Sequence, residues 1–142
     1  MAGLLIEFRD WWGRDEPPDA SFLAGVRRLI AERDTEYLLG SVAGGEPAAV
    51  CQLRFRHGIW HDAEDCWLED LFVRADARRS GLGAALTEAA IHRARERGCA
   101  RIQLDVSEAN PAALALYGRF GFVSGSGPLG ERNLFMGLGL AG

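Results

Sequence analysis

The sequence predicts an α/β fold of the α+β type, in which a mixed, mostly antiparallel β-sheet is flanked by helices. Two stretches carry this prediction. Residues 36–57 hold two apolar runs separated by a glycine-containing turn, which predicts an antiparallel hairpin. Residues 66–106 hold a strand, a helix and a second strand, which predicts a parallel pair. Pattern counting over the 142 residues gives about seven strands and about four helices in a single domain, 1–142.

The N-terminal region predicts a strand, a loop and a helix. Leu4–Phe8 is a short apolar run typical of a first strand, and residues 10–19 have the glycine, prolines and charges of a connecting loop. Asp19 or Ser21 is suited to cap the helix that follows. Its apolar stripe predicts packing against the sheet and consists of Phe22, Leu23, Val26, Leu29 and Ile30.

The hairpin comes next in the chain. Residues 36–43 and 47–57 are its two strands, and the Gly44-Gly45-Glu46 turn supplies residues that tolerate positive φ. A polar loop with aromatic residues follows over 57–65. Residues 66–73 are then typical of a buried strand, so the sequence predicts three consecutive strands in this part of the chain.

A helix and a parallel strand follow a short basic loop. The helix repeats apolar residues at i, i+3, i+4, i+7 and i+8, namely Leu82, Ala85, Leu86, Ala89 and Ala90. Gly98 is placed to end it. Residues 102–106 alternate strictly between apolar and polar, which predicts a strand parallel to the one at 66–73.

The C-terminal region predicts one short helix and two closing strands. Asn110 is suited to cap the helix, and Pro111 to occupy its first position. The helix runs on over 112–119, and residues 122–123 and 133–140 are the predicted strands.

Composition limits the classes of function. The chain has 20 acidic and 16 basic residues and a formal charge of −4, which argues against nucleic acid as a partner. It has no apolar run of membrane-spanning length and no leader pattern at its N-terminus, so we expect a cytoplasmic protein without a membrane partner. The cysteines are three and widely spaced, which favours buried thiols over disulfides or a metal site.

Residues 68–86 contain a candidate anion site. An apolar strand leads into a basic loop and then into a helix, whose first backbone N–H groups have no partners inside the helix. Gly81 and Gly83 let a phosphate approach those groups, and Arg78 and Arg79 add positive charge. An ordinary glycine-containing turn has the same pattern, so this loop alone does not decide the function.

A second motif makes the pattern specific. The loop residues 78–83, RRSGLG, follow a strand, and residues 110–122, NPAALALYGRFGF, span a helix and the chain after it. Together, in this order and at this separation, the two motifs resemble those of the GCN5-related N-acetyltransferase (GNAT) family over most of the chain. The WLEDLFV segment at 67–73 is similar to the diamine acetyltransferase branch of that family.

The resemblance implies acetyl-CoA as co-substrate. In the family, the fourth and fifth strands are parallel and splay apart, and the pantetheine arm pairs with the backbone of the fourth strand. The residues that the resemblance assigns to the cofactor are Leu71, Phe72, Val73, Arg78, Arg79, Ser80, Gly81, Leu82, Gly83, Ala84, Asn110 and Tyr117.

The resemblance also implies the catalytic groups. Tyr117 occupies the position of the family's general acid near the thioester sulfur, although packing between helix and sheet is the plainer interpretation. Glu69 corresponds to a glutamate that acts on the amine, and Asp70 is the alternative base. Strand alternation places these two carboxylates on opposite faces unless a bulge shifts them, and a solvated pair is the plainer interpretation.

The sequence thus predicts an acetyl-CoA-dependent N-acetyltransferase that acts on a small primary amine without a metal. The acceptor classes are a polyamine-like molecule, an amino acid or an antibiotic amine. The alternatives are a protein N-terminal or lysine acetyltransferase and a non-catalytic acyl-CoA-binding regulatory module. We expect the acceptor pocket to involve the first helix region and residues 57–65 and 124–132, and a homodimer is compatible with the family.

Overall fold

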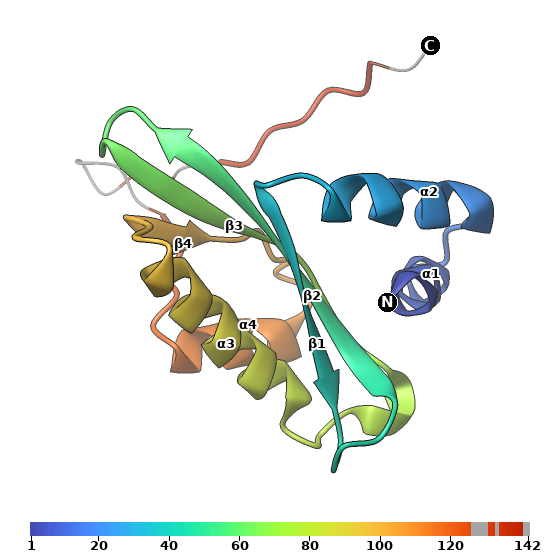
Figure 1. The fold of residues 1–142 in the computed structure, drawn as a ribbon. Helices are drawn as coiled ribbons and strands as arrows, with labels where there is room; N and C mark the ends of the chain where they lie inside the picture. Colours follow the sequence, from blue (N-terminus) through green and yellow to red (C-terminus); the bar gives the residue numbers. More distant parts are fainter. Residues whose placement is uncertain (126–130, 133, 141–142) are drawn as a thin grey trace. The chain divides into compact units, whose positions relative to one another are not determined.

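The structure is a computed structural model that describes residues 1–125, 131–132 and 134–140. The chain divides into two compact units, residues 1–104 and 105–142. The first unit holds a four-stranded sheet in the order β1-β2-β3-β4, with α1 and α2 on one face and α3 on the other (Figure 1). The predicted fold class is therefore confirmed, with four strands in the described sheet instead of about seven.

The predicted hairpin is confirmed. β1 (Thr35–Ser41) pairs antiparallel with β2 (Pro47–Gly58). Gly44 adopts a φ of +75° in the turn between them, and the Gly45 N–H donates to the Val42 carbonyl at 2.9 Å. Glycine at this position permits a left-handed conformation that a side chain disfavours, which is why the turn could be recognised from sequence.

The strand–helix–strand unit is also confirmed, with different bounds. β3 (Ala63–Val73) pairs antiparallel with β2 and parallel with β4 (Arg101–Gln103). β3 begins three residues earlier than predicted, so the expected loop over 57–65 shrinks to residues 59–62. β4 is shorter than the predicted strand over 102–106 because its pairing with β3 stops at Gln103.

The predicted first strand at Leu4–Phe8 is wrong. The segment belongs to a helix, α1 (Ala2–Trp11), with Leu4 and Leu5 buried against the sheet. A short apolar run has no distinct period, so it is compatible with either a strand or a helix. The spacing of Met1, Leu5, Phe8 and Trp12 fits one helical face and indicates the helix once the whole segment is considered.

The helix predicted to follow the loop at 10–19 is confirmed, but its cap is not. α2 (Asp19–Ile30) has Pro18 at the N-cap position, and no side chain there accepts a hydrogen bond. Asp19 lies in the first turn, where its charge interacts favourably with the helix dipole. Asp19 and Ser21 are therefore not the capping residues.

A short 3₁₀ turn, η1 (Ala75–Ala77), leads from β3 to α3 (Leu82–Glu96). Gly98 follows α3 with a φ of +74°, as predicted for a glycine that ends a helix. The buried stripe of α3 consists of Leu82, Leu86, Thr87, Ala90 and Ala94.

Each face of the sheet has its own buried layer. We define the α1/α2 face as the side of the sheet that packs against α1 and α2, and the α3 face as the opposite side. The hydrophobic cluster on the α1/α2 face consists of Leu4, Leu5, Val26, Val50 and Phe72, with Tyr37 packed against it. Because strand residues alternate, the buried Cys51, Leu53 and Phe55 of β2 point to the α3 face.

The second unit contains α4 (Pro111–Arg119). The two predicted closing strands are wrong for the described residues, because 122–125 and 134–140 are not in strands, while Asn133 lies outside the described part. The apolar side chains of residues 134–140 are exposed, including Phe135 at 80% and Leu138 at 84%. An apolar run is therefore insufficient to predict a strand without a pairing partner.

Candidate active site

The loop before α3 leaves backbone donors unpaired. Gly81 is the N-cap of α3 and has a φ of +87°. The first intrahelical bond runs from the Ala85 N–H to the Gly81 carbonyl at 2.9 Å. Within the described residues, the N–H groups of Leu82, Gly83 and Ala84 have no acceptor, as expected for the first turn of a helix. This end of α3 carries partial positive charge and is suited to bind an anion.

The shape of the loop leaves room for that anion. A Cβ atom placed on Gly81 would meet no protein atom within 4 Å. Arg79 has a φ of +65°, an uncommon conformation for a residue with a side chain. The Ser80 hydroxyl donates to the Ala77 carbonyl at 2.6 Å, which holds the loop against η1. The space in front of the unpaired N–H groups is thus open.

The two loop arginines lie differently. The Arg78 Nε donates to the Val73 carbonyl at 3.2 Å, and its guanidinium lies over the Trp11 ring at 5.0 Å. Arg78 therefore contacts α1 and the end of β3. Arg79 is exposed. Arg78 is thus held against α1, and no such contact is found for Arg79 among the described residues.

The parallel pairing of β3 with β4 ends before the end of β3. β3 and β4 pair only at Asp65–Arg101, Cys66–Ile102 and Trp67–Gln103. Beyond that point, β2 is the only described strand that pairs with residues 68–73 of β3. This leaves one backbone edge of residues 68–73 available to an extended ligand.

A bulge lies at the predicted carboxylates. Gln52 pairs with Asp70 and Leu53 pairs with Leu68, so Glu69 has no partner in β2. Bulges of this kind redirect side chains at functional sites. The alternation that would separate Glu69 from Asp70 is thereby interrupted at Glu69.

Besides burial, the charges of Asp70 and Glu69 both raise the pKa of Tyr37, a residue of the α1/α2 face. Burial, followed by the charge of Asp70, raises the pKa of Tyr37 to about 12, and Glu69 shifts this pKa in the same direction. Tyr37 pairs with Gln52 across β1 and β2, and Gln52 pairs with Asp70 across β2 and β3. Gln52 is only 5% exposed, so the three residues form a partly buried polar row across the sheet.

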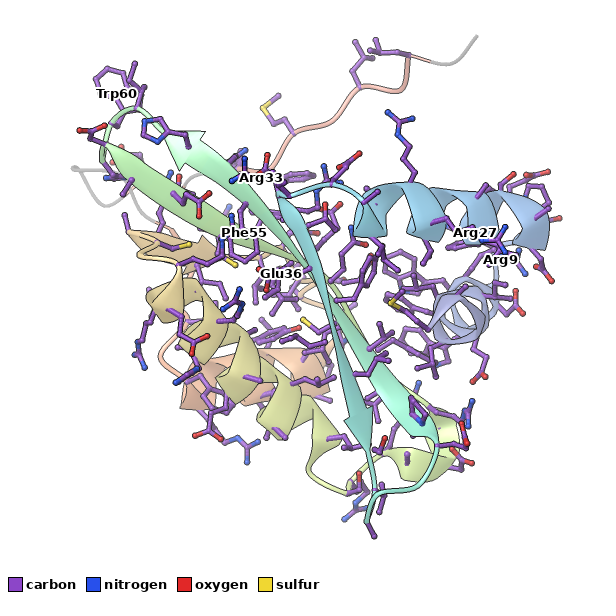
Figure 2. All side chains as sticks on the ribbon, in the orientation of Figure 1. Arg9, Arg27, Arg33, Glu36, Phe55 and Trp60 are labelled. Atoms are coloured by element: carbon purple, nitrogen blue, oxygen red, sulfur yellow. The ribbon has the colours of Figure 1, made fainter. Side chains whose placement is uncertain are left out.

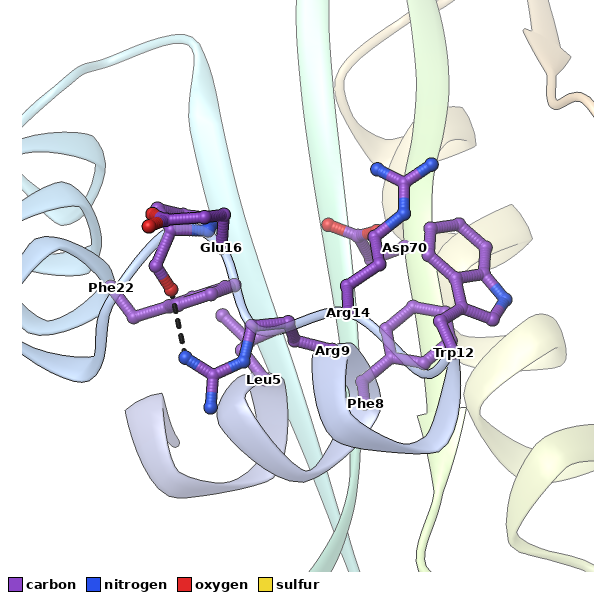
Figure 3. Close-up of a pocket in the computed structure, with 9 residues that line it drawn as sticks. Leu5, Phe8, Arg9, Trp12, Arg14, Glu16, Phe22 and Asp70 are labelled. Atoms are coloured by element: carbon purple, nitrogen blue, oxygen red, sulfur yellow. Dashed lines mark hydrogen bonds between the residues drawn. The ribbon is translucent and has the colours of Figure 1, made fainter.

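A cavity of about 120 Å³ adjoins Asp70 (Figure 3). It lies between α1, the segment that leads to α2, α2 itself and β3. Its walls are formed by Leu5, Phe8, Arg9, Trp12, Arg14, Glu16, Pro17, Phe22 and Asp70. Residues near the predicted first helix thus line a cavity, and its role as the acceptor pocket stays a prediction.

The other segments expected at the pocket are placed differently. Trp60 lies at the tip of the β2–β3 turn and is 92% exposed (Figure 2). Residues 57–65 contribute no wall to the cavity, and residues 126–130 lie outside the described part. Sequence reasoning missed Phe8 and Arg14 as pocket residues, because it assigned Phe8 to a strand and Arg14 to a loop without a partner.

The second unit carries the helix with Tyr117. The Asn110 carboxamide accepts a hydrogen bond from the Ala113 N–H at 3.1 Å, and Pro111 begins the helix. Asn110 is therefore a helix cap, as predicted. The Tyr117 ring meets the Phe122 ring edge to face, with centroids 5.6 Å apart. Tyr117 is partly exposed.

Neither a metal site nor a membrane span is found in the described residues. No group of three or more His, Cys, Asp or Glu side chains there is arranged to hold a metal ion. None of the described helices has the length and apolar character needed to cross a membrane. Cys51 and Cys66 are buried, and burial raises the pKa of both thiols to about 12.

Comparison with protein families identifies the fold and its motifs. The model of the acetyltransferase (GNAT) family matches residues 4–122. The chain belongs to the GNAT family. The match includes the loop at 78–83 and the motif at 110–122, so the resemblance predicted from these residues is confirmed.

Two relatives of this chain are named as N-acetyltransferases. An aminoglycoside N(6′)-acetyltransferase of Klebsiella aerogenes is 33% identical over 109 residues, which are 72% of this chain and 66% of that protein. A thialysine N-ε-acetyltransferase of Caenorhabditis elegans is 31% identical over 111 residues, 77% of this chain and 69% of that protein. The chain thus spans about two thirds of the length of these relatives.

Solved structures share the GNAT fold. A probable acetyltransferase has a TM-score of 0.85 at 20% identity, over 97% of this chain and 89% of the other. An aminoglycoside N-acetyltransferase in complex with CoA has a TM-score of 0.74 at 20% identity, over 96% and 85% of the two chains. These similarities support the α+β fold.

The first unit fits the CoA of a GNAT protein. A pyrophosphate needs hydrogen-bond donors and positive potential, and the start of α3 offers both next to the open space at Gly81. The amides of a pantetheine arm need a free backbone edge, and residues 68–73 of β3 offer one. Both features lie on one continuous segment of the chain.

Proposed function

We propose that this protein transfers the acetyl group of acetyl-CoA to the primary amine of a small molecule, by direct attack in a ternary complex. The observation that carries the proposal is the bulge at Glu69. It lies on a strand that has a free edge on one side, the anion-binding loop at its end, and a cavity beside Asp70. These features support a base, a CoA site and an acceptor site that share one strand.

The cofactor roles in this proposal follow the chain. The backbone of Leu71, Phe72 and Val73 pairs with the pantetheine arm. The loop from Arg78 to Ala84 binds the pyrophosphate through the unpaired N–H groups at the start of α3. Arg79 adds charge from an exposed position, and Ser80 keeps the loop in shape through its bond to Ala77.

The chemistry needs one base and one acid. The amine nitrogen forms a bond to the acetyl carbon and loses a proton, while the thioester C–S bond breaks and the sulfur gains a proton. Glu69 or Asp70 accepts the amine proton, directly or through water. Tyr117 supplies the proton to the sulfur, because a phenol is protonated at neutral pH. Acetyl-CoA brings the activated acetyl group.

The acceptor in this proposal is a small amine. Relatives named for aminoglycoside and thialysine acetylation support an amine acceptor. The acceptor binds at the cavity beside Asp70, whose carboxylate attracts the ammonium form before it is deprotonated. The candidate classes are polyamine-like molecules, amino acids and antibiotic amines.

Two measurements test the proposal. Isothermal titration should show binding of acetyl-CoA, and a thiol-release assay with a panel of small amines should show CoA formation that depends on the amine. Binding without amine-dependent release would support a regulatory module instead. Absence of both binding and release would refute the proposal. Tyr117→Phe should lower kcat and leave the acetyl-CoA affinity nearly unchanged.

A further inference from the structure

The cavity beside Asp70 is small and mostly apolar. Its volume of about 120 Å³ is close to that of an engineered cavity of roughly 150 Å³ that holds a benzene molecule. Phe8 packs on Trp12 with ring centroids 4.8 Å apart and on Phe72 at 5.1 Å. Phe22 and Leu5 complete the apolar walls. The cavity therefore accommodates a single ring or a branched alkyl group.

Part of this apolar surface is left uncovered. Trp12 is 58% exposed although its ring lies against Phe8. An apolar group that covers this ring gains about 25 cal/mol for each Å² removed from water. The uncovered surface favours a ligand with an apolar body over one that is polar throughout.

The two arginines of the cavity differ in their partners. Arg9 is paired with Asp10 and Asp19 and donates to the Pro17 carbonyl at 2.8 Å. Arg14 lies over the Trp12 ring at 5.3 Å, and no ion pair joins it to any carboxylate of the described residues. Among the described residues, Arg14 is therefore the arginine of the cavity without an ion pair.

Arg14 and Asp70 lie toward the same end of the cavity. Figure 3 shows both side chains on the Trp12 side, whereas Glu16 and Phe22 lie on the other side. A guanidinium without an anionic partner and a carboxylate at one end fit a head group that carries both a carboxylate and an ammonium. The apolar walls then fit the remainder of the same molecule.

We infer that the acceptor is an amino acid with an apolar side chain, whose ammonium lies at Asp70, whose carboxylate binds Arg14 and whose side chain packs against Phe8 and Trp12. This inference rests on the proposed acetyl transfer. Of the proposed acceptor classes it retains the amino acids, and it identifies Arg14 as the residue that recognises their carboxylate.

The charge of the cavity disfavours polycationic acceptors. Polyamines and aminoglycosides carry several ammonium groups, and a site for them needs carboxylates in excess. Arg9 is paired with Asp10 and Asp19, so Arg14 is the wall cation that is left to contact a ligand, beside Glu16 and Asp70. A zwitterion has an anionic group for Arg14, whereas a polycation has none.

The test compares acceptors that have the same alkyl group and differ in the carboxylate. Leucine, leucinamide and 3-methylbutylamine have the same alkyl group and a primary amine, but only leucine has a carboxylate. We expect kcat/KM for leucine to exceed that for the other two by about tenfold to a hundredfold, since a hydrogen bond to a charged group has this effect. Phenylalanine and 2-phenylethylamine repeat the comparison with a ring.

Variants at Arg14 complete the test. Arg14→Gln should remove the preference for leucine over leucinamide and 3-methylbutylamine, so that the three acceptors have similar values of kcat/KM. Arg95→Gln is the matched control. Arg95 is exposed on α3, so this substitution removes the same charge at a position away from the cavity. The control should keep the preference of the wild type.

The outcomes separate this inference from the proposed function. If leucinamide reacts as well as leucine, or if Arg14→Gln keeps the preference, the inference is wrong. If spermidine or an aminoglycoside is acetylated and amino acids are not, acetyl transfer stands and the amino acid class is wrong. If no amine of the panel reacts, the proposed function fails first, and the inference fails with it.

Discussion

The α3 face and the α1/α2 face of the sheet satisfy their polar side chains to different degrees. On the α3 face, Glu36 accepts from Arg93 at 2.6 Å and from Arg97 at 3.1 Å, and Arg97 also binds Glu64 at 2.9 Å. The Arg97 guanidinium lies over the Phe55 ring at 3.9 Å. Every charge in this group has an opposite charge next to it.

The α1/α2 face lacks this completeness. The Tyr37 hydroxyl is buried, and no group of the described residues pairs with it. The face also holds the bulge at Glu69, the cavity beside Asp70 and the exposed Trp12 ring. Polar groups without partners and uncovered apolar surface destabilise a fold, so their concentration on one face indicates a site kept for ligands.

We therefore expect the two faces of the sheet to have separate roles. The ion pairs of the α3 face stabilise the sheet and hold α3 in position. The α1/α2 face provides the chemistry that we propose. Mutations on the two faces should therefore separate stability from activity, and the following predictions are ordered from the largest expected effect to the smallest.

The largest effect is expected from the double variant Glu69→Gln/Asp70→Asn. It removes both candidate bases, so kcat should fall by about 100-fold to 1000-fold, as is typical for the loss of a general base. The affinity for acetyl-CoA should stay within about threefold of the wild type. Steady-state kinetics and isothermal titration measure the two quantities.

Glu88→Gln is the control for this variant, because Glu88 is an exposed residue of α3. It should have wild-type kcat. A double variant that retains full kcat would remove the base role from both carboxylates of the α1/α2 face.

The next effect concerns the two ends of α3. Gly81 and Gly98 both have positive φ, and a Cβ at either would meet no protein atom within 4 Å. Alanine at either position should lower the free energy of unfolding by about 1 kcal/mol, because both require a left-handed conformation. Only Gly81→Ala should also weaken acetyl-CoA binding, by about tenfold or more, because its methyl group occupies the proposed pyrophosphate space.

Titration of acetyl-CoA into the two variants checks this prediction, with Gly98→Ala as the matched control for lost stability. Equal affinities of Gly81→Ala and Gly98→Ala would show that the loop before α3 does not bind the pyrophosphate.

Arg97→Met should have the opposite profile. It leaves Glu64 and Glu36 with fewer partners and removes the cation over Phe55, so the free energy of unfolding should fall by about 2 kcal/mol. The value of kcat/KM should not change while the protein is folded. Urea denaturation and kinetics at a low temperature measure the two quantities.

The acid dependence of this variant gives a second check. Hydrogen bonds from arginines lower the pKa of Glu36, mainly through Arg93, and of Glu64, through Arg97. A lowered pKa in the folded state gives stability that is complete above the ordinary pKa of 4.5 and is lost as the pH falls through the folded value. The wild type should lose more stability below pH 4.5 than Arg97→Met. Parallel acid curves would contradict this origin of the stability.

The smallest effect compares one buried hydroxyl on each face. Tyr37→Phe removes a hydroxyl without a partner in the described residues. The free energy of unfolding should therefore stay the same or rise by less than about 1 kcal/mol. Thr87→Val removes a hydroxyl that donates to the Gly83 carbonyl at 2.8 Å and should destabilise by about 1 kcal/mol. A larger loss for Tyr37→Phe than for Thr87→Val would contradict the difference between the faces.

Local chemistry explains which elements could be predicted from sequence. The hairpin has Gly44 at a positive φ, and α3 is bounded by Gly81 and Gly98, so glycines mark the ends of these elements. The cap of α4 depends on Asn110 and its own backbone neighbourhood, and it was also predicted correctly. Elements that are defined by nearby residues are visible in a single sequence.

Features that depend on distant residues were missed. The bulge at Glu69 arises from the register of β3 on Gln52 and Leu53, which no local pattern encodes. The segment Leu4–Phe8 is a helix because its apolar face packs on a sheet formed later in the chain. The cavity could not be predicted for the same reason, since it joins Phe8, Phe22 and Asp70.

The rate of acetyl transfer to leucine by three proteins tests the separation of the two faces most directly. The wild type, Glu69→Gln/Asp70→Asn and Arg97→Met are compared at a temperature at which all three are folded, with mass spectrometry of the N-acetyl product. We predict equal rates for the wild type and Arg97→Met and a loss of about 100-fold or more for the carboxylate variant. A full rate in the carboxylate variant, or an equal loss in folded Arg97→Met, would contradict the assignment of chemistry to the α1/α2 face.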